Sequence, residues 1–228
     1  MISSIYKKSF SVLASKPLRL WGISLLSIFL SMAAYILFGV IPGAAIAIGL
    51  LLETSMTLIY LNGFLGQEVK TLQLFDCFRS WRTIGRVLGG MAWMLMWVLL
   101  WSLIPVAGVV FGVIKFYSYR LTPYILMKEP EVKATEAYKL SEQRTMGYKG
   151  KMFWADVLPV LAYIAAVLIL SAFSAIPYLG WLFALVLAVL VVAFAVFLPL
   201  FLGLVQSAFY VEIQKSLDPP AAGMGWYE

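Results

Sequence analysis

The sequence contains no histidine and a single cysteine, Cys77, among its 228 residues. One cysteine cannot form an internal disulfide, and without histidine the chain lacks the commonest metal ligand and the commonest general base. These absences exclude disulfide frameworks, Cys/His metal sites and catalysis by an imidazole. We expect no cofactor and no metal. Carboxylate-only or Ser–Lys chemistry is left open, but no motif supports it, so we predict that the protein is not an enzyme.

Charged residues are also scarce, at 12% of the chain, whereas 63% of the residues are hydrophobic and the mean hydropathy is +0.93. A soluble domain has about half apolar and about a quarter charged residues. A soluble protein of this composition would have nothing to cover most of its apolar surface. The composition therefore predicts an integral membrane protein.

The formal net charge of +6 does not indicate a nucleic-acid-binding protein. The basic residues punctuate apolar spans and form no face on which they alternate with aromatic residues. Anionic lipid head groups are the better match for such a distribution. We therefore expect membrane lipids as partners, with another membrane protein as a further candidate and no nucleic acid.

A short phrase occurs three times: an aromatic residue, a small residue, any residue and then Ile-Pro. Its copies are Phe38-Gly39-Val40-Ile41-Pro42, Trp101-Ser102-Leu103-Ile104-Pro105 and Phe173-Ser174-Ala175-Ile176-Pro177. Proline ends one helix and can begin the next. Each copy therefore predicts a tight turn between two helices.

Small residues follow each of these prolines at offsets of three and seven residues. They are Ala45 and Gly49, Gly108 and Gly112, and Gly180 and Ala184. This is the small-xxx-small spacing that allows membrane helices to approach closely. We expect these faces to contact other helices rather than lipid.

The pattern predicts an all-α polytopic membrane protein with six transmembrane helices arranged as three helical hairpins. We expect spans over residues 20–41, 43–65, 87–104, 106–127, 153–176 and 178–199, and connectors over residues 70–86, 131–146 and 200–215. Residues 70–86 have the spacing of an amphipathic helix that lies in the membrane interface; a target-binding helix is the alternative. The chain would be one membrane domain, 1–228, with repeat units 1–86, 87–150 and 151–216 and a disordered tail, 217–228.

A cleaved signal peptide at the start is disfavoured because the first apolar region is too long and more spans follow.

Apart from Lys115, lysine and arginine fall at the start of the chain, in the connectors and beside them, and none lies near the Ile-Pro turns. By the positive-inside rule, the connectors, Cys77 and both termini are cytoplasmic and the turns face outward. The three units would then share one orientation and could be related by an approximate threefold axis along the membrane normal.

Two charged residues lie deep in predicted spans. Glu53 follows Pro42 by eleven residues and Lys115 follows Pro105 by ten, which places both ~15–16 Å from the outer turns, near the middle of a ~30 Å core. A lone charge at that depth costs ~2.5–3.5 kcal/mol. We therefore predict that Glu53 and Lys115 pair, either to fix the register of two helices or to form a charged site for a ligand or a proton.

Two stripes of side chains recur at helical spacing. The polar stripe, which should face other helices, is Ser24, Ser27, Ser31 and Tyr35; the aromatic stripe is Trp93, Trp97 and Trp101. Tryptophan normally prefers the membrane interface, so a stripe across the bilayer is unusual. Bulky packing or lipid contact explains it most simply, and an aromatic groove for an amphipathic ligand is the alternative.

One region is similar to a known family. Its residues are Lys115-Phe116-Tyr117-Ser118-Tyr119, Pro123-Tyr124-Ile125-Leu126, Pro130, Glu136-Ala137, Ser141, Met146-Gly147, Lys149 and Phe153, and later Ala208-Phe209-Tyr210. This pattern resembles the bacterial integral membrane proteins of domain-of-unknown-function family 975. The resemblance implies a six-span protein of the bacterial cytoplasmic membrane, and it brings no catalytic residues.

Two functions follow from these features. The first is a non-enzymatic membrane component that acts through helix and lipid contacts, as an accessory or protective part of another membrane system. The alternative is a transporter or a lipid- or peptide-handling protein with a charged intramembrane site, since ionisable residues inside spans often mark pathways. A cavity that reaches from Glu53 toward either face would favour the alternative.

Overall fold

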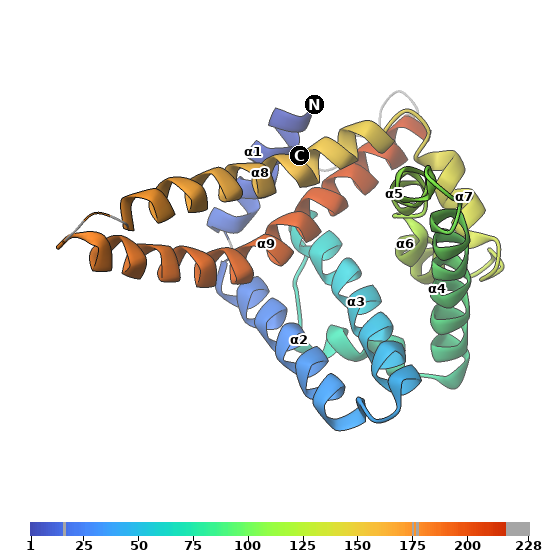
Figure 1. Cartoon of the computed structure of the whole chain (residues 1–228). Coiled ribbons are helices and arrows are strands. Elements are labelled where there is room, and N and C mark those ends of the chain that lie inside the picture. Colours follow the sequence, from blue (N-terminus) through green and yellow to red (C-terminus); the bar gives the residue numbers. More distant parts are fainter. Residues whose placement is uncertain (16, 175, 177, 218–228) are drawn as a thin grey trace, which may run out of the picture.

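The computed structural model describes residues 1–15, 17–174, 176 and 178–217, which are helical over most of their length and contain no strand (Figure 1). The elements are α1 (Ile2–Ser15), α2 (Pro17–Phe38), α3 (Pro42–Phe64), the 3-10 helix η1 (Thr71–Phe78), α4 (Trp81–Ser102), α5 (Gly108–Ser118), α6 (Thr122–Lys128), α7 (Ala137–Arg144), α8 (Lys149–Ser174) and α9 (Gly180–Leu217). Five of them, α2, α3, α4, α8 and α9, contain segments long and apolar enough to cross a membrane. The all-helical fold class is confirmed, and these five helices fit a membrane protein.

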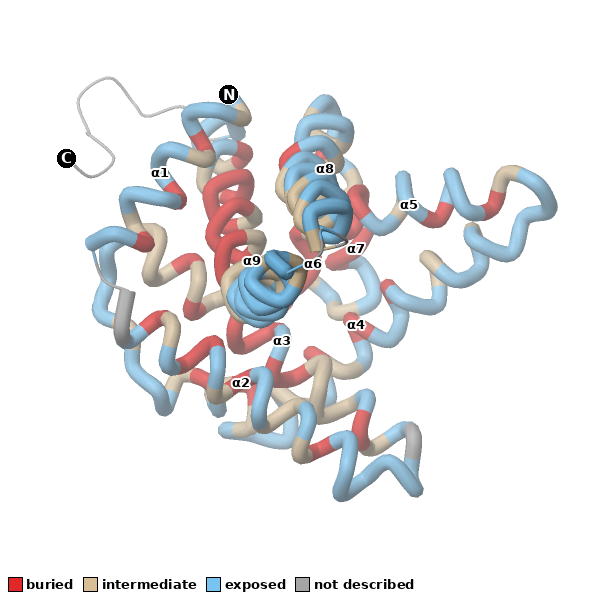
Figure 2. Tube along the Cα trace, turned by 60° about the vertical axis from the view of Figure 1, so that its left-hand side comes forward, coloured by how far each residue is buried: buried red, intermediate tan, exposed pale blue. Residues whose placement is uncertain are grey.

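Helices that follow one another across an Ile-Pro phrase pack together: α2 with α3, α4 with α5, and α8 with α9. The three pairs point in different directions. The turn between α2 and α3 lies at the bottom of Figure 1, the far ends of α8 and α9 lie at its left, and α4 and α5 extend to the right in Figure 2. Buried residues gather where the pairs converge, which we call the base, and the outer parts are mostly exposed (Figure 2). The pairs are therefore held together at one end.

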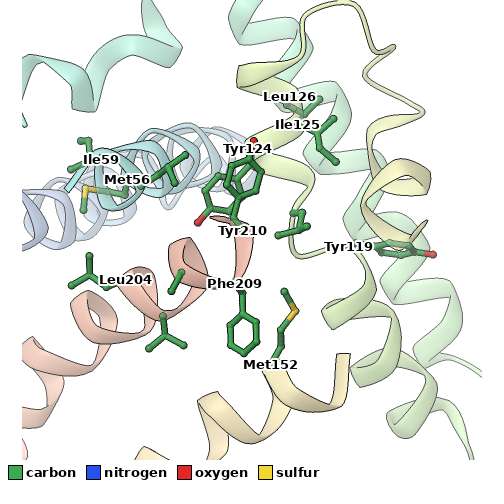
Figure 3. Close-up of a cluster of buried hydrophobic side chains, with 14 of the residues drawn as sticks. Met56, Ile59, Tyr119, Tyr124, Ile125, Leu126, Met152, Leu204, Phe209 and Tyr210 are labelled. Carbon is green, nitrogen blue, oxygen red and sulfur yellow. The ribbon is translucent and has the colours of Figure 1, made fainter. Parts of the chain in front are cut away.

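The base has a hydrophobic core built from α3, α6, α8 and α9 (Figure 3). Tyr124 stacks on Tyr210 with 4.3 Å between ring centroids. Phe209, Leu204 and Met152 are each no more than 2% exposed. Close packing of these large side chains therefore holds the helix pairs together at the base.

The apolar stretch expected to form one span over residues 106–127 is divided. α5 ends at Ser118 and α6 begins at Thr122. The 11 residues of α5 extend ~16 Å, too short for a ~30 Å hydrocarbon core. Pro123 explains the break because it has no N–H and its ring clashes with the carbonyl of Tyr119, four residues earlier. The prediction of one continuous helix here is therefore wrong.

The last helix is longer than predicted. We expected a span to end near Pro199 and residues 200–215 to form a separate connector, but α9 continues through Pro199 to Leu217. Proline is tolerated inside membrane helices when neighbouring groups compensate for the missing hydrogen bond. The third connector is therefore the end of α9. The predicted tail beyond Leu217 lies outside the described residues.

The other two connectors are only partly the helices that the spacing predicted. The first forms η1, whose Leu74 and Cys77 are buried, whereas Leu72 is 78% exposed. The second is helical only over α7, after a series of turns. Each connector therefore presents a short apolar face to the base rather than a long one.

Two of the three Ile-Pro turns share an unusual backbone conformation. Val106 and Tyr178, the residues directly after the second and third prolines, have φ angles of 67° and 66°. Non-glycine residues rarely adopt these left-handed values. The first turn differs, because α3 begins at Pro42 itself.

The glycines near two of these turns permit a close approach between the paired helices. A Cβ added to Gly108 would lie 2.2 Å from the carbonyl oxygen of Ser102, and one added to Gly180 would lie 2.1 Å from that of Ser174. A Cβ on Gly112 would lie 2.2 Å from Ser102 Oγ. The second and third pairs therefore use the same Ser–Gly contact.

The remaining small residues are placed differently. Ala45 is buried, whereas an added Cβ on Gly49 would meet only open space, and Ala184 is exposed. Gly49 faces a groove rather than a neighbouring helix, and Ala184 lies on an exposed position of α9. The expected packing face is thus incomplete in the first and third units.

Candidate functional site

A groove of about 520 Å³ lies between α2, α3 and α9. In Figure 1, α2 and α3 lie below α9. Its polar lining consists of Ser24, Ser27, Ser31, Glu53, Thr57, Tyr60 and Gln206. Its apolar lining consists of Ile28, Gly49, Met56, Pro199, Leu202 and Gly203. The groove therefore combines a row of hydrogen-bonding groups with an apolar wall.

The serines of α2 form one side of the groove because they recur every three or four residues and so share a helix face. Ser24 Oγ lies 3.1 Å from Tyr60 Oη, which ties α2 to α3. Tyr35, the last member of the predicted stripe, is 70% exposed and lies beyond the groove.

The close approach of α9 depends on Gly203. A Cβ at this position would lie 2.2 Å from the ring of Tyr60. The aromatic ring therefore occupies the space that a side chain would need, and its hydroxyl extends toward Ser24.

Among the described residues, Glu53 is the only formally charged side chain that lines the groove. It is exposed to the groove, and among the described residues no ion pair includes its carboxylate. Its neighbours on the same face of α3, Thr57 and Tyr60, follow at four and seven residues. An acidic group thus faces a polar space from the middle of an apolar helix.

The predicted pairing of Glu53 with Lys115 requires correction. Lys115 Nζ lies 2.6 Å from Glu142 Oε1 and 4.8 Å from the ring centroid of Trp101. The partner Glu142 belongs to α7, which packs against α5. Depth in the membrane does not identify this partner, because Glu142 belongs to residues 131–146, which the sequence predicts to be a connector.

Other charged side chains at the base are also paired. Arg120 forms an ion pair with Asp156 of α8, and Tyr117 Oη donates a hydrogen bond to the same carboxylate at 3.1 Å. The side chains of Arg120 and Asp156 are only 12% and 15% exposed. This pair joins the broken helix to α8.

A second pair holds the segment between α6 and α7. Arg144 donates to both carboxylate oxygens of Glu129, with 2.9 Å from Nη2 to Oε2. Arg86 of α4 donates to the carbonyls of Leu126 and Glu129 at 2.9 and 2.7 Å. Both arginines therefore anchor the end of α6.

The break between α5 and α6 leaves backbone groups that α7 satisfies. Ser141 Oγ donates to the carbonyl of Ser118 at 2.9 Å and accepts from the N–H of Leu121 at 3.0 Å. Thr145 Oγ1 also donates to the carbonyl of Ser118, at 3.0 Å. Irregular backbone at membrane depth is tolerated only where such partners exist, so α7 stabilises the break.

Gln206 connects the break to the groove. Its Nε2 donates to the carbonyl of Arg120 at 3.1 Å, and the residue also lines the groove beside Glu53. The sequence does not mark this role, because residues 200–215 have the position of a separate connector. Helical spacing does indicate that Thr57 and Tyr60 line the groove, since both share a helix face with Glu53.

The aromatic stripe of α4 packs against neighbouring helices. Trp97 stacks on Tyr138 of α7 with 6.0 Å between ring centroids, and Trp101 contacts Phe111 of α5 at 5.9 Å. Trp93 lies edge-on to Trp97. These contacts fit the packing interpretation of the stripe better than the aromatic-groove alternative.

Cys77 is fully buried in η1, where its Sγ lies 3.7 Å from Met127 Sδ. Burial raises the pKa of its thiol, which lowers the fraction of reactive thiolate at neutral pH. The described residues contain no group of three or more Asp, Glu or Cys side chains placed to hold a metal ion.

The chain matches no protein-family model, no curated protein and no solved structure. Its function therefore has to be argued from the chemistry of the groove.

Proposed function

We propose that this protein is a non-enzymatic, multi-pass membrane protein that binds a cationic amphipathic ligand in the groove at Glu53. Its role would be transport or the handling of lipids or peptides. The observation that carries the proposal is the unpaired carboxylate of Glu53 in a polar-lined groove between α2, α3 and α9.

An unpaired charge inside a membrane span is energetically costly. A carboxylate near the middle of a span costs ~2.5–3.5 kcal/mol, and among the described residues no lysine or arginine lines the groove. A ligand with an ammonium or guanidinium group would supply the missing charge. Its N–H groups could also donate to the serine hydroxyls, and its apolar part would lie against Met56 and Leu202.

Membrane topology is a further part of the proposal. We infer six crossings, the fourth made by α5 and α6 together, with connectors and both termini cytoplasmic in a bacterial cytoplasmic membrane. The shared φ values of Val106 and Tyr178 support an internal repeat of at least the second and third units. Membership of domain-of-unknown-function family 975 stays a prediction from the residues that carry the resemblance.

The orientation can be tested with an introduced cysteine, because Cys77 itself is too buried to react. Leu72, 78% exposed on η1, is suitable: Leu72→Cys in a Cys77→Ala chain should react with a membrane-impermeant maleimide only after the cells are opened. Labelling of this cysteine in intact cells would reverse the proposed orientation.

Ligand binding can be tested with dansylcadaverine, an apolar fluorophore that carries a primary amine, and with its N-acetylated form, which is neutral. The protein is placed in nanodiscs of zwitterionic lipid, and binding to empty nanodiscs is subtracted. We expect the amine to bind more tightly than the acetylated form. Glu53→Gln should weaken amine binding by about thirtyfold or more, because removal of one partner of a desolvated charge pair costs ~2–5 kcal/mol.

Glu212→Gln provides the matched control, since Glu212 lies on α9 but does not line the groove. This variant should bind both probes as the parent does. Equal binding of the amine by the parent and by Glu53→Gln would contradict the proposal. That result would favour the other function, an accessory component that acts only through helix and lipid contacts.

A further inference from the structure

A second pocket, of about 400 Å³, lies between α5 and α8, away from the groove at Glu53. It is lined by Val109, Val110, Val113, Ile114, Tyr117, Lys149, Gly150 and Phe153. From Val109 to Tyr117 the wall extends ~12 Å along the helix axis. The wall is almost entirely hydrocarbon and suits an extended apolar chain.

One end of this pocket carries an excess of positive charge. Glu142 Oε1 lies 2.6 Å from Lys115 Nζ and 3.8 Å from Lys149 Nζ, so two ammonium groups share one carboxylate. Asp156, an acidic residue of the neighbouring helix α8, forms an ion pair with Arg120 and does not offset this charge. Lys149, the more weakly held of the two lysines, is the one that lines the pocket.

We propose that this pocket is a binding site for an anionic phospholipid of the surrounding membrane. One acyl chain lies along the valines of α5, and the phosphate group contacts Lys149. The arrangement selects for net negative charge because a zwitterionic head group would bring its own cation toward Lys149. This site is independent of the ligand proposed for Glu53.

The test compares phosphatidylglycerol with phosphatidylcholine of identical acyl chains. Each lipid is titrated into the full-length protein in detergent, and bound lipids are counted by native mass spectrometry. We expect the parent to retain phosphatidylglycerol preferentially. Lys149→Gln should weaken phosphatidylglycerol binding by about fivefold, the equivalent of the ~1 kcal/mol that one lysine contributes near an anionic surface, and leave phosphatidylcholine unchanged.

Two variants make the result specific. Lys149→Arg keeps the charge and should restore the preference, which separates lipid binding from a loss of folding. Lys151→Gln removes a nearby charge that does not line the pocket. Lys151 Nζ instead lies over the ring of Tyr148.

Lys151→Gln should therefore keep the preference for phosphatidylglycerol. Equal retention of both lipids by the parent, or equal losses in the Lys149→Gln and Lys151→Gln variants, would overturn the proposal. Glu53→Gln should not change phosphatidylglycerol retention, so either proposed site can be refuted without refuting the other.

Discussion

Charged side chains form ion pairs at the base, whereas the charged side chain in the groove has no ion-pair partner among the described residues. At the base, Arg120 has Asp156, Arg144 has Glu129 and Lys115 has Glu142, each as an ion-pair partner from another segment of the chain. In the groove, Glu53 faces hydroxyl and amide groups with no cation among them. The first arrangement stabilises contacts between helices. The second leaves one charge available, which is what a binding site requires.

The largest expected effect comes from breaking a pair at the base. Arg120→Gln leaves Asp156 as a nearly buried, uncompensated charge and should lower the free energy of unfolding by ~3–5 kcal/mol. Replacing both members together, as Arg120→Met with Asp156→Leu, should recover much of this loss. The measurement is unfolding in mixed micelles of SDS and dodecyl maltoside.

Glu53→Gln is the control in the same assay. Because Glu53 has no ion-pair partner among the described residues, its replacement removes an uncompensated charge and should not lower the free energy of unfolding. A loss comparable to that of Arg120→Gln would make Glu53 a structural residue and remove the contrast between the two regions.

A smaller effect is expected from a single added methyl group. Gly112→Ala places a Cβ against Ser102, whose hydroxyl is already held by a hydrogen bond to the carbonyl of Val98 at 2.8 Å. Overpacking of this kind costs ~1–3 kcal/mol. Gly49→Ala is the matched control, because its Cβ would enter open space in the groove. Equal stability of the two variants in the same micelles would refute the close contact at Gly112.

The smallest effect is a coupling energy between two residues. Lys115→Met and Glu142→Gln should show a coupling of ~1 kcal/mol in a double-mutant cycle, as residues in direct contact usually do. Lys115→Met and Glu53→Gln should be additive. A coupling between Lys115 and Glu53 as large as that with Glu142 would restore the pair that the sequence predicted.

Much of the fold could be predicted from the sequence because its signals are local. The Ile-Pro phrases mark the ends of α2 and α4 and the start of α3, since proline acts through its own ring and its missing N–H. The same rule failed to separate Pro123, where the helix breaks, from Pro199, where it continues. What separates them is distant in sequence: at the first break, Ser141 and Thr145 bind the carbonyl of Ser118.

The candidate site was predictable only in part, for a similar reason. Helical spacing identified Glu53 and the serines of α2, which share the groove. Depth alone could not identify the partner of Lys115, because Glu142 reaches it only after the chain breaks at residues 119–121 and α7 docks beside α5. Contacts that depend on how connectors fold back leave no local pattern.

The most direct test of the central claim is to locate a bound amine covalently. The parent protein in nanodiscs is treated with dansylcadaverine and a lipid-soluble carbodiimide, which joins an amine to an adjacent carboxylate as an amide and is itself converted to a urea. We predict that peptide mapping finds the dansyl group on Glu53. Dansyl groups found only on exposed acids outside the groove, such as Glu68 and Glu131, would contradict the account.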